Sequence, residues 1–207
     1  MTLAQQLAQG VKELGVTLPA GAQERLLQYL ALLQKWNRVY NLTAVREPQR
    51  MVSEHLLDCL AVTPYIGENR ILDVGSGAGL PGIPLALALP DARVTLLDSN
   101  HKKAAFLQQA VTELKLGNVA IACERVEGWK PAARFAVVIS RALSDLGEFV
   151  ALAGRHVAAG GCLAAMKGVH PYDEIAQLPS GWQVRQTLPL TVPGLRGQRH
   201  LVLVEPV

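Results

Sequence analysis

A glycine-rich segment with an acid in front of it is the part of this 207-residue sequence whose residue types could do chemistry. It reads DVGSGAG from Asp73 to Gly79 and follows a short apolar run. Glycines at the end of a strand let the backbone approach a ligand closely. A second acid, Asp98, ends the next apolar run 25 residues after the first, where a carboxylate can bind both hydroxyls of a ribose. Together these features predict a site for an adenosine-containing cofactor.

Two cofactors fit this pattern, and a tight strand–helix turn without a ligand is a third interpretation. The residues from Gly77 to Gly82 match the G-x-G-x-x-G pattern of dinucleotide sites. However, Asp73 stands two residues before Gly75, at the end of the strand. An acid there suits a cofactor with a cation, such as the ammonium of S-adenosylmethionine, and suits a pyrophosphate poorly. We therefore favour a methyltransferase and keep an NAD-dependent oxidoreductase as the alternative.

The elements before the glycine segment are expected to be helical. Apolar residues recur at spacings of three and four within residues 3–14, 20–40 and 48–62, and Gly15 should end the first of these helices. No β pattern precedes Arg70. We interpret residues 1–66 as an N-terminal helical extension and residues 67–207 as an S-adenosylmethionine-dependent methyltransferase domain.

From Arg70 onward, strand patterns alternate with helical ones. Strands are expected at residues 70–75, 93–98, 119–123, 135–140 and 162–166, and helices at residues 81–89, 101–116 and 143–157, the last stopping at Gly160-Gly161. Such alternation predicts parallel pairing. The β patterns at 184–192 and 200–207 form a hairpin and must pair antiparallel. The prediction is an α/β fold with a doubly wound, mostly parallel, Rossmann-like sheet of about seven strands and an antiparallel C-terminal strand.

Ligands of open α/β sheets bind beyond the carboxyl ends of the strands, and several polar residues follow those ends. Residues 124–127 follow the third strand, where an adenine would lie, while Arg141 follows the fourth and Lys167 the fifth. Lys102 and Lys103 fall in the first turn of a helix, where a cation is disfavoured by roughly 0.3–1 kcal/mol. A nearby anion such as an RNA phosphate would offset this cost, and a solvated lysine pair is the alternative.

The composition excludes several classes of protein. Hydrophobic residues make up 50% of the chain and charged residues 18%, which argues against a disordered chain or a charge-rich nucleic-acid tail. The three cysteines are far apart, without a CxxC or Cys/His pair, so we expect no disulfide framework and no zinc site. The longest apolar stretch, residues 80–89, is too short to span a membrane, and no signal-peptide pattern opens the chain. We expect a cytoplasmic, monomeric protein.

The residues after the fourth strand narrow the choice of methyl acceptor. Methylation of pyrimidine C5 needs a nucleophilic thiol, and none of the cysteines follows a proline or threonine. Methylation of exocyclic amines commonly uses an Asn/Asp-Pro-Pro-aromatic clamp, where this chain has SRAL at residues 140–143. Guanine N7 has an in-plane lone pair and no proton to lose. A site without an obvious base is therefore compatible with guanine N7, although it does not select it.

Other stretches are more distinctive than the cofactor glycines. GLPGIP runs from Gly79 to Pro84, and further distinctive stretches lie at residues 35–37, 40–43, 55–58, 96–99, 139–142, 167–168 and 199–201. On these stretches the sequence resembles the bacterial small-subunit (16S) ribosomal RNA guanine-N7 methyltransferase family, also called the glucose-inhibited division protein B family. The resemblance implies a class I methyltransferase fold. It also implies S-adenosylmethionine as donor, S-adenosylhomocysteine as product, no metal, and a target guanine near the decoding site of 16S RNA, either naked or within the small subunit or an assembly intermediate.

The resemblance also implies roles for individual residues. The cofactor contacts that it implies are Gly75, Leu80, Val126, Glu127 and Arg141, to which the arguments above add Asp73, Gly77 and Asp98. The RNA-binding positions that it implies are Lys102, Lys103, Lys167, Arg199 and His200. Arg141 is the catalytic candidate. Because a fixed cation cannot act as a base, we expect it to orient the cofactor carboxylate or an RNA phosphate as a bidentate donor.

The stretch from Trp36 to Thr43 allows two interpretations. Trp36 and Tyr40 are expected in the core, with Asn37 and Asn41 as solvated or capping residues. The alternative is a segment that covers the cofactor pocket as a lid or helps to dock RNA. For the chain as a whole, a non-catalytic division or ribosome-binding module is a further alternative, against which the intact cofactor motif counts.

Overall fold

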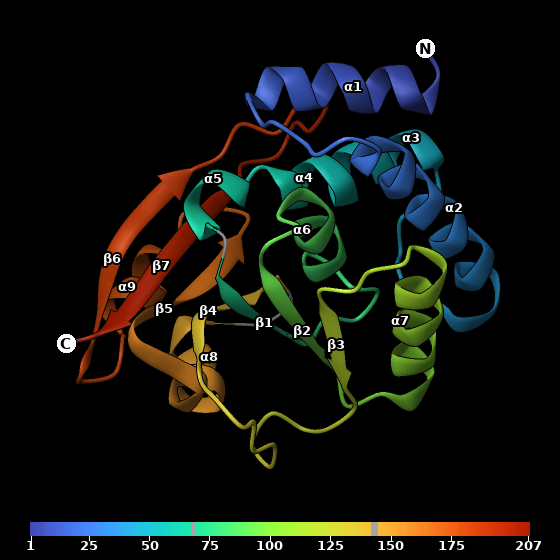
Figure 1. Cartoon of the computed structure of the whole chain (residues 1–207). Coiled ribbons are helices and arrows are strands. Elements are labelled where there is room, and N and C mark those ends of the chain that lie inside the picture. Colours follow the sequence, from blue (N-terminus) through green and yellow to red (C-terminus); the bar gives the residue numbers. More distant parts are fainter. Residues whose placement is uncertain (68, 142–144) are drawn as a thin grey trace.

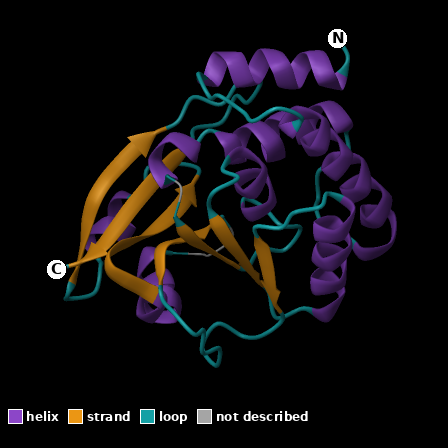
Figure 2. Ribbon diagram, viewed as in Figure 1, coloured by secondary structure: helices purple, strands orange, loops and turns teal. Residues whose placement is uncertain are grey.

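The computed structural model, which describes residues 1–67, 69–141 and 145–207, contains one sheet of seven strands (Figures 1 and 2). In chain order these are β1 (Arg70–Val74), β2 (Arg93–Leu97), β3 (Val119–Ala122), β4 (Phe135–Ser140), β5 (Val157–Lys167), β6 (Trp182–Pro189) and β7 (His200–Pro206). Their order across the sheet is β3-β2-β1-β4-β5-β7-β6. β1 to β5 pair in parallel, and β7 pairs antiparallel with both β5 and β6. The predicted doubly wound sheet with its antiparallel C-terminal strand is confirmed.

Helices precede the sheet, as predicted. They are α1 (Leu3–Leu14), α2 (Ala22–Tyr40), a continuous run of α3 (Pro48–Met51), the π-helical segment η1 (Val52–Leu57) and α4 (Asp58–Leu60), and finally α5 (Thr63–Ile66). Gly15 ends α1 in the left-handed conformation, at φ 66°, which glycine adopts without steric cost. Leu26 and Leu56 of these helices are buried in the same hydrophobic core as Val94 of β2. The N-terminal helices therefore share one core with the sheet and with the helices that cover it, and the domain boundary after residue 66 stays a prediction.

Helices flank both faces of the sheet (Figure 1). α6 (Gly82–Ala88) and α7 (His101–Glu113) share one core with the N-terminal helices, and α8 (Leu146–Ala153) contributes to a second core. Because strand side chains alternate between faces, Ile71 of β1 points into the first core and Leu72 into the second. On the face of the second core, Thr95 of β2 and Ala120 of β3 keep exposed surface. That face is therefore less covered along β2 and β3 than along β4 and β5.

The start of β5 differs from the prediction. The helix expected at 143–157 ends at Ala153 and passes through a 3₁₀ turn, η2 (Gly154–His156), so that the strand begins at Val157 rather than at Cys162. Residues 143 and 144 of that predicted helix lie outside the described residues. The predicted helix is thus wrong in its last four residues, and the predicted strand is too short.

A bulge explains why the glycine pair misled the prediction. Gly160 and Gly161 lie inside β5, where the pairing with β4 jumps from Phe135–Val157 to Val137–Cys162. Gly160 has a φ of 73°, and a Cβ on Gly161 would lie 2.6 Å from the carbonyl oxygen of Ala136. A bulge of this kind inserts extra residues into one strand only. Its glycines are required by the neighbouring strand and do not end a helix.

Two further features complete the fold. A short helix that the sequence did not predict, α9 (Tyr172–Ala176), lies between β5 and β6. No helix in the described ranges is both long and apolar enough to cross a membrane.

We predict that Gly161→Ala destabilises the protein by about 1–3 kcal/mol, because the added methyl group overpacks the bulge against the backbone of β4. The free energy of unfolding in urea measures this loss. Gly117→Ala is the matched control, since a Cβ at Gly117 meets no described atom within 4 Å. Equal losses for the two variants would contradict the close approach at Gly161.

Candidate functional site

The glycine segment forms the loop between β1 and α6. Gly75, Gly77 and Gly79 all have positive φ, at 69°, 57° and 85°, a region that other residues adopt only with strain. The backbone N–H of Gly75 donates to Leu97 O of β2 at 2.9 Å. The hydroxyl of the buried Tyr29 on α2 donates to Ala78 O at 2.7 Å. The loop is therefore fixed from both a strand and an N-terminal helix.

Asp98, at the end of β2, holds the same loop. Its Oδ2 accepts the backbone N–H of Gly77 at 2.8 Å, and its Oδ1 accepts that of Asn100 at 2.9 Å. The ammonium of Lys103 lies 3.8 Å from Oδ2. The residue is 7% exposed, so an edge of it remains available beside the loop. The ribose contact predicted for Asp98 is compatible with this position and stays a prediction.

Asp73 lies beneath the loop and has no exposed surface. Its Oδ2 accepts the backbone N–H of Gly82 at 2.9 Å, in the first turn of α6. Its Oδ1 has no hydrogen-bond partner in the described part of the chain. Burial raises the pKa of Asp73 to about 7, while the Gly82 N–H and the Arg141 cation act in the opposite direction. The carboxylate supports the loop in this structure, and its predicted contact with a cofactor cation stays a prediction.

A hollow of about 330 Å³ opens beside the loop at the carboxyl ends of β1, β2 and β3. It brings together four of the residues predicted to bind the cofactor, namely Gly75, Asp98, Val126 and Glu127, and Lys103 also lines it. Leu80 is only 4% exposed and packs in the main core. Glu127 is exposed and pairs with Arg125 at 3.1 Å. This cofactor hollow, as we call it below, thus joins the glycine loop to the segment after β3.

Arg155, which the sequence analysis missed, holds the segment after β3 in place. Its Nη2 donates to the carbonyl oxygens of Val126 at 2.7 Å, Glu127, and Trp129 at 3.3 Å. The imidazole Nε2 of His156 lies 3.1 Å from Val126 O, a contact in which only the nitrogen can donate. Both residues belong to η2, which the sequence predicted as the end of a helix. The sequence could have indicated their role only if the early start of β5, directly after these two residues, had been predicted.

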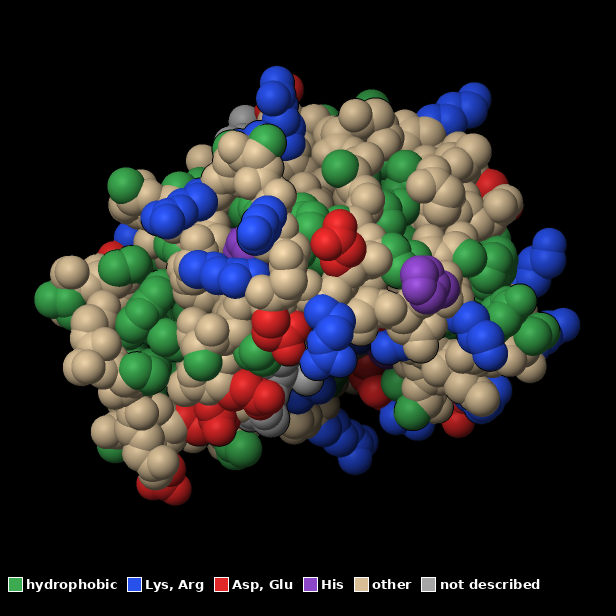
Figure 3. All heavy atoms as spheres, turned by 90° about the horizontal axis from the view of Figure 1, so that it is seen from below, with side chains coloured by type: hydrophobic (Ala, Val, Ile, Leu, Met, Phe, Trp, Pro, Cys, Tyr) green, Lys and Arg blue, Asp and Glu red, His purple; other side chains and the backbone are tan. Residues whose placement is uncertain are grey.

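A second hollow of about 360 Å³ lies where β4 and β5 end. It brings three predicted residues, Arg141, Lys167 and Arg199, together with Glu54, His55 and Asp58 of the N-terminal helices. We call it the acceptor hollow because it surrounds the residue predicted to face the reacting groups. Seen from below Figure 1, where β2 and β3 end, Lys and Arg side chains surround a hollowed region with Asp and Glu among them (Figure 3).

One carboxylate links the arginines of the acceptor hollow. Asp58 Oδ1 accepts a hydrogen bond from Arg199 Nε at 3.0 Å, and Oδ2 lies 3.5 Å from Arg141 Nη1. Arg141 Nη1 also donates to the carbonyl oxygen of Glu54 at 3.0 Å. The Asp58 side chain is 5% exposed. Burial raises the pKa of Asp58, and the cations of Arg141 and Arg199 oppose that shift. Sequence reasoning missed Asp58, although it lies in one of the distinctive stretches.

Several predicted RNA-binding residues have partners within the chain. Lys167 Nζ lies 2.7 Å from Glu174 Oε2, and its side chain is 11% exposed. His200 Nδ1 lies 2.8 Å from Gly168 O. At the start of α7, Asn100 Oδ1 accepts the backbone N–H groups of Lys102 and Lys103. The cost expected for cations there is thus reduced by a cap and, for Lys103, by Asp98. RNA contacts of these residues and of Arg199 stay predictions.

The stretch after α2 folds back on itself. Asn37 Nδ2 donates to Thr43 O and Asn37 Oδ1 accepts the Thr43 N–H, both at 2.9 Å. This is the capping role expected for Asn37. Trp36 packs against Phe106, but Tyr40 is 43% exposed, so its expected core position is wrong. The ring of Tyr40 packs at a tilt against that of Trp36, with a centroid distance of 5.2 Å. A lid or RNA-docking role for this stretch remains a hypothesis.

His55 connects that stretch to the acceptor hollow. Its Nε2 lies 2.8 Å from Thr43 Oγ1, and its buried Nδ1 has no hydrogen-bond partner within the described ranges. Burial, together with the Arg141 cation, lowers the pKa of His55 to about 4. The imidazole is therefore neutral near pH 7. Among the described residues, this region included, no group of three or more His, Cys, Asp and Glu side chains could hold a metal ion.

Comparisons with known proteins agree on one family. The profile of a family described as rRNA small subunit methyltransferase G matches residues 22–202. A protein of Nitrosospira multiformis named "Ribosomal RNA small subunit methyltransferase G" is 59% identical, over 99% of this chain and 98% of that protein. A protein of the same name from Laribacter hongkongensis is 55% identical, over 98% of each chain.

Solved structures with low sequence identity share the fold. The O-methyltransferase TomG from Streptomyces achromogenes, solved in complex with SAM, aligns with a TM-score of 0.60 at 16% identity, over 100% of this chain and 99% of TomG. A ribosomal protein L11 methylase from Lactobacillus delbrueckii subsp. bulgaricus aligns with a TM-score of 0.57 at 12% identity, over 72% of this chain and 76% of that one.

We predict that Asp98→Ala weakens binding of S-adenosylmethionine about ten- to hundredfold, because hydrogen bonds to a charged group contribute about 1.5–3 kcal/mol. The substitution also removes the acceptor that fixes Gly77. Calorimetric titration measures the affinity. Asp91→Ala is the control, since Asp91 lies in the exposed turn before β2. Unchanged affinity in Asp98→Ala would remove this carboxylate from the site.

We also predict that His55 makes stability depend on pH. The unfolded chain binds a proton at this residue near pH 6.5, whereas the folded chain binds it near pH 4. The contribution is therefore complete above pH 6.5 and is lost as the pH falls toward 4, by up to about 3 kcal/mol. Urea unfolding at several pH values should show a shallower fall in His55→Gln than in the parent and in the control His101→Gln. Identical pH slopes in all three would refute the assignment.

Proposed function

Because this chain belongs to the rRNA small subunit methyltransferase G family, we propose that it transfers a methyl group from S-adenosylmethionine to N7 of a guanine in 16S ribosomal RNA near the decoding site. The observation that carries the proposal is the pair of hollows at the carboxyl edge of one sheet. One is built around a glycine loop and an acid, and the other around two arginines. We further propose that the enzyme acts as a monomer.

The residues of the cofactor hollow fit S-adenosylmethionine. A Cβ on Gly75 would meet no described atom within 4 Å, so the space beside this glycine is open. Asp98 presents a carboxylate edge at the same place, next to Val126 and Glu127. We assign the ribose to Asp98, the adenine to the segment held by Arg155, and the methionine end to the side of Asp73 and Arg141. Leu80 and Gly77 support the loop.

When bound, S-adenosylmethionine supplies an electrophilic methyl group on a sulfonium. Guanine N7 needs no proton removed before it attacks, so the protein has to align the base and exclude water. The neutral, solvent-shielded His55 and the permanently charged Arg141 fit a site of this kind. Positive charge moves from sulfur to the base during transfer, and neither residue has to change its protonation state.

We assign Arg141 the role of a hydrogen-bond donor that orients the cofactor or the RNA. Its Nη1 is held by Glu54 O and faces Asp58, so its position is set before any ligand arrives. The rest of its fork can bind the carboxylate of the cofactor or an RNA phosphate. Arg199 is held by the other oxygen of Asp58 and serves as an RNA contact beside it.

The remaining RNA contacts follow from exposure and pairing. Lys102 is exposed and has the strongest case for a phosphate contact. Lys103 and Lys167 pair with Asp98 and Glu174, so a phosphate has to compete with those carboxylates. The substrate is either naked 16S RNA or RNA within the small subunit or an assembly intermediate.

Transfer of labelled methyl groups tests the proposal. Naked 16S RNA and small ribosomal subunits that lack the modification are each incubated with protein and labelled S-adenosylmethionine, and the modified base is then mapped. The proposal predicts label at N7 of one guanine near the decoding site, and S-adenosylmethionine but not NAD should raise the melting temperature. Label on another atom, or no label in either substrate, would contradict it.

We predict that Asp58→Asn slows methyl transfer at saturating S-adenosylmethionine about ten- to hundredfold, because two charge-assisted contacts to arginines are weakened. Affinity for the adenosine end of the cofactor, followed with 5′-methylthioadenosine, which lacks the amino-acid part, should change less than threefold. Glu205→Gln is the control, since Glu205 pairs with Arg185 on the β6–β7 hairpin. A rate equal to that of the control variant would show that Asp58 has no part in the reaction.

A further inference from the structure

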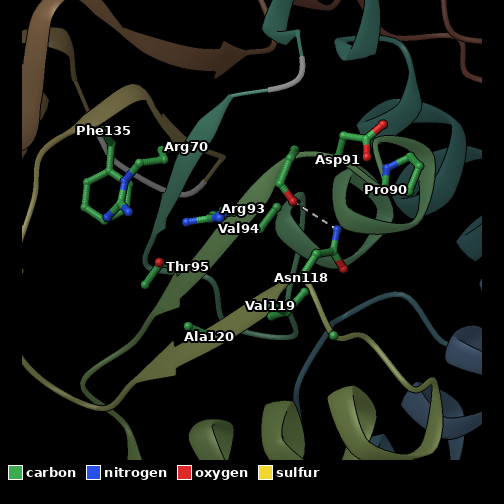
Figure 4. A pocket seen from close by; sticks show the side chains of 12 residues that line it. Arg70, Pro90, Asp91, Arg93, Val94, Thr95, Asn118, Val119, Ala120 and Phe135 are labelled. Carbon is green, nitrogen blue, oxygen red and sulfur yellow. Dashed lines mark hydrogen bonds between the residues drawn. The ribbon is translucent and has the colours of Figure 1, made fainter.

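A basic groove lies where β1 and β2 begin, at the end of these strands opposite to the cofactor hollow (Figure 4). Its volume is about 480 Å³. Arg70, Arg93 and Thr95 line it from neighbouring strands, and Phe135 lines it from the start of β4. In the first two strands, Ile71 and Val94 point into the main core. The alternation of side chains therefore places Arg70 and Arg93 on the other, less covered face.

The two arginines are direct neighbours. Arg70 and Arg93 occupy paired positions of β1 and β2, and strands are about 4.8 Å apart. Like charges directly opposite each other in a sheet are unfavourable. Neither guanidinium lies within 4 Å of a carboxylate in the part of the chain that the structure describes. Asp91, the acid that lines this groove, lies across it from Arg70 (Figure 4).

Arg70 is held in place without its charge being neutralised. Its guanidinium lies over the buried ring of Phe135, 5.2 Å from the centroid, and its Nη2 makes a long contact of 3.5 Å to Ala133 O. Stacking on an aromatic ring orients a guanidinium and leaves its in-plane donors free. The exposed Arg93 has no side-chain partner within the described ranges. The pair thus presents donors to one place.

The groove continues along the sheet face. A second hollow of about 510 Å³ shares Arg70, Thr95 and Phe135 with it and extends to Trp129 and Lys130. The small side chains of Thr95 and Ala120 form the floor. Arg93, Arg70 and Lys130 therefore follow one another along an open channel, with Glu124 the acid at its far end. Such a channel accommodates an extended chain better than a compact ligand.

We propose that this channel binds the sugar–phosphate backbone of RNA, with one phosphate shared by Arg70 and Arg93 and a second near Lys130. The inference rests on the proposed function and adds a contact surface that meets the cofactor hollow at Glu124 and otherwise lies outside both hollows. A bridging phosphate removes the like-charge repulsion between the arginines and accepts their bidentate donors. The substrate RNA is then held at two places on the molecule.

The test is the salt dependence of RNA binding by the double variant Arg70→Gln/Arg93→Gln. Binding to the 16S RNA or small subunits that the parent methylates is titrated between about 50 and 200 mM salt. Losing the phosphate contact that the two arginines share should lower the slope of log affinity against log salt by about 0.7–0.9 and weaken binding about tenfold. Affinity for S-adenosylmethionine should stay unchanged, because neither arginine lines the cofactor hollow.

The control Lys12→Gln/Arg25→Gln removes the same two charges from α1 and α2. It should leave the slope within error of the parent. A slope in Arg70→Gln/Arg93→Gln equal to that of the control overturns the channel as an RNA site. If Arg70→Gln unfolds the protein by uncovering Phe135, the single variant Arg93→Gln decides, with a slope lowered by about half as much. A parent that neither binds nor methylates the RNA would instead refute the proposed function.

Discussion

The carboxylate of Asp58 is the point on which the acceptor side of this protein depends. A charge that is almost completely removed from water is costly unless it is paired, and Asp58 is paired with Arg199, which lies 141 residues away in the sequence. Its other oxygen faces Arg141, whose guanidinium is also held by the backbone at Glu54. Three segments therefore meet at one carboxylate: the N-terminal helical run, the end of β4 and the start of the C-terminal strand. For this reason the N-terminal helices build part of the site.

The cofactor side follows the same logic with backbone groups as partners. Asp98 and Asp73 accept N–H groups at the two ends of the glycine loop, and Tyr29 fixes the loop between them. At the segment after β3 the roles are reversed, because the guanidinium of Arg155 donates hydrogen bonds to several backbone carbonyl oxygens. Both walls of the cofactor hollow are thus held by side-chain contacts to the backbone, from Asp98 in its lining and from Arg155 outside it. A preformed hollow of this kind loses little conformational entropy when a ligand binds, and this favours affinity.

The features that depend on local sequence patterns could be predicted. Alternating strands and helices gave the sheet, and the glycine segment with Asp98 located the cofactor edge. The features that could not be predicted from the sequence depend on residues that lie far apart in the chain. The bulge at Gly160 and Gly161 exists because β4 lies beside it. Arg155 reaches the carbonyl oxygens of the segment after β3 only because β5 begins earlier than predicted. In the same way, the role of Asp58 emerges only when the fold brings Arg199, 141 residues away, beside it. Tyr40 has the spacing of a core residue, but it is the last residue of α2 and is 43% exposed.

The claim that Asp58 acts through the arginines it holds is tested most directly by a double-mutant cycle with Arg199. Single-turnover methyl transfer to the small-subunit RNA is measured for the parent, Asp58→Asn, Arg199→Gln and the double variant, all with cofactor and RNA saturating. If the two residues act as a pair, Asp58→Asn slows the reaction much less in the Arg199→Gln background than in the parent, with a coupling free energy of about 0.5–3 kcal/mol. Effects that simply multiply would contradict this account and would leave Asp58 and Arg199 as independent contributors.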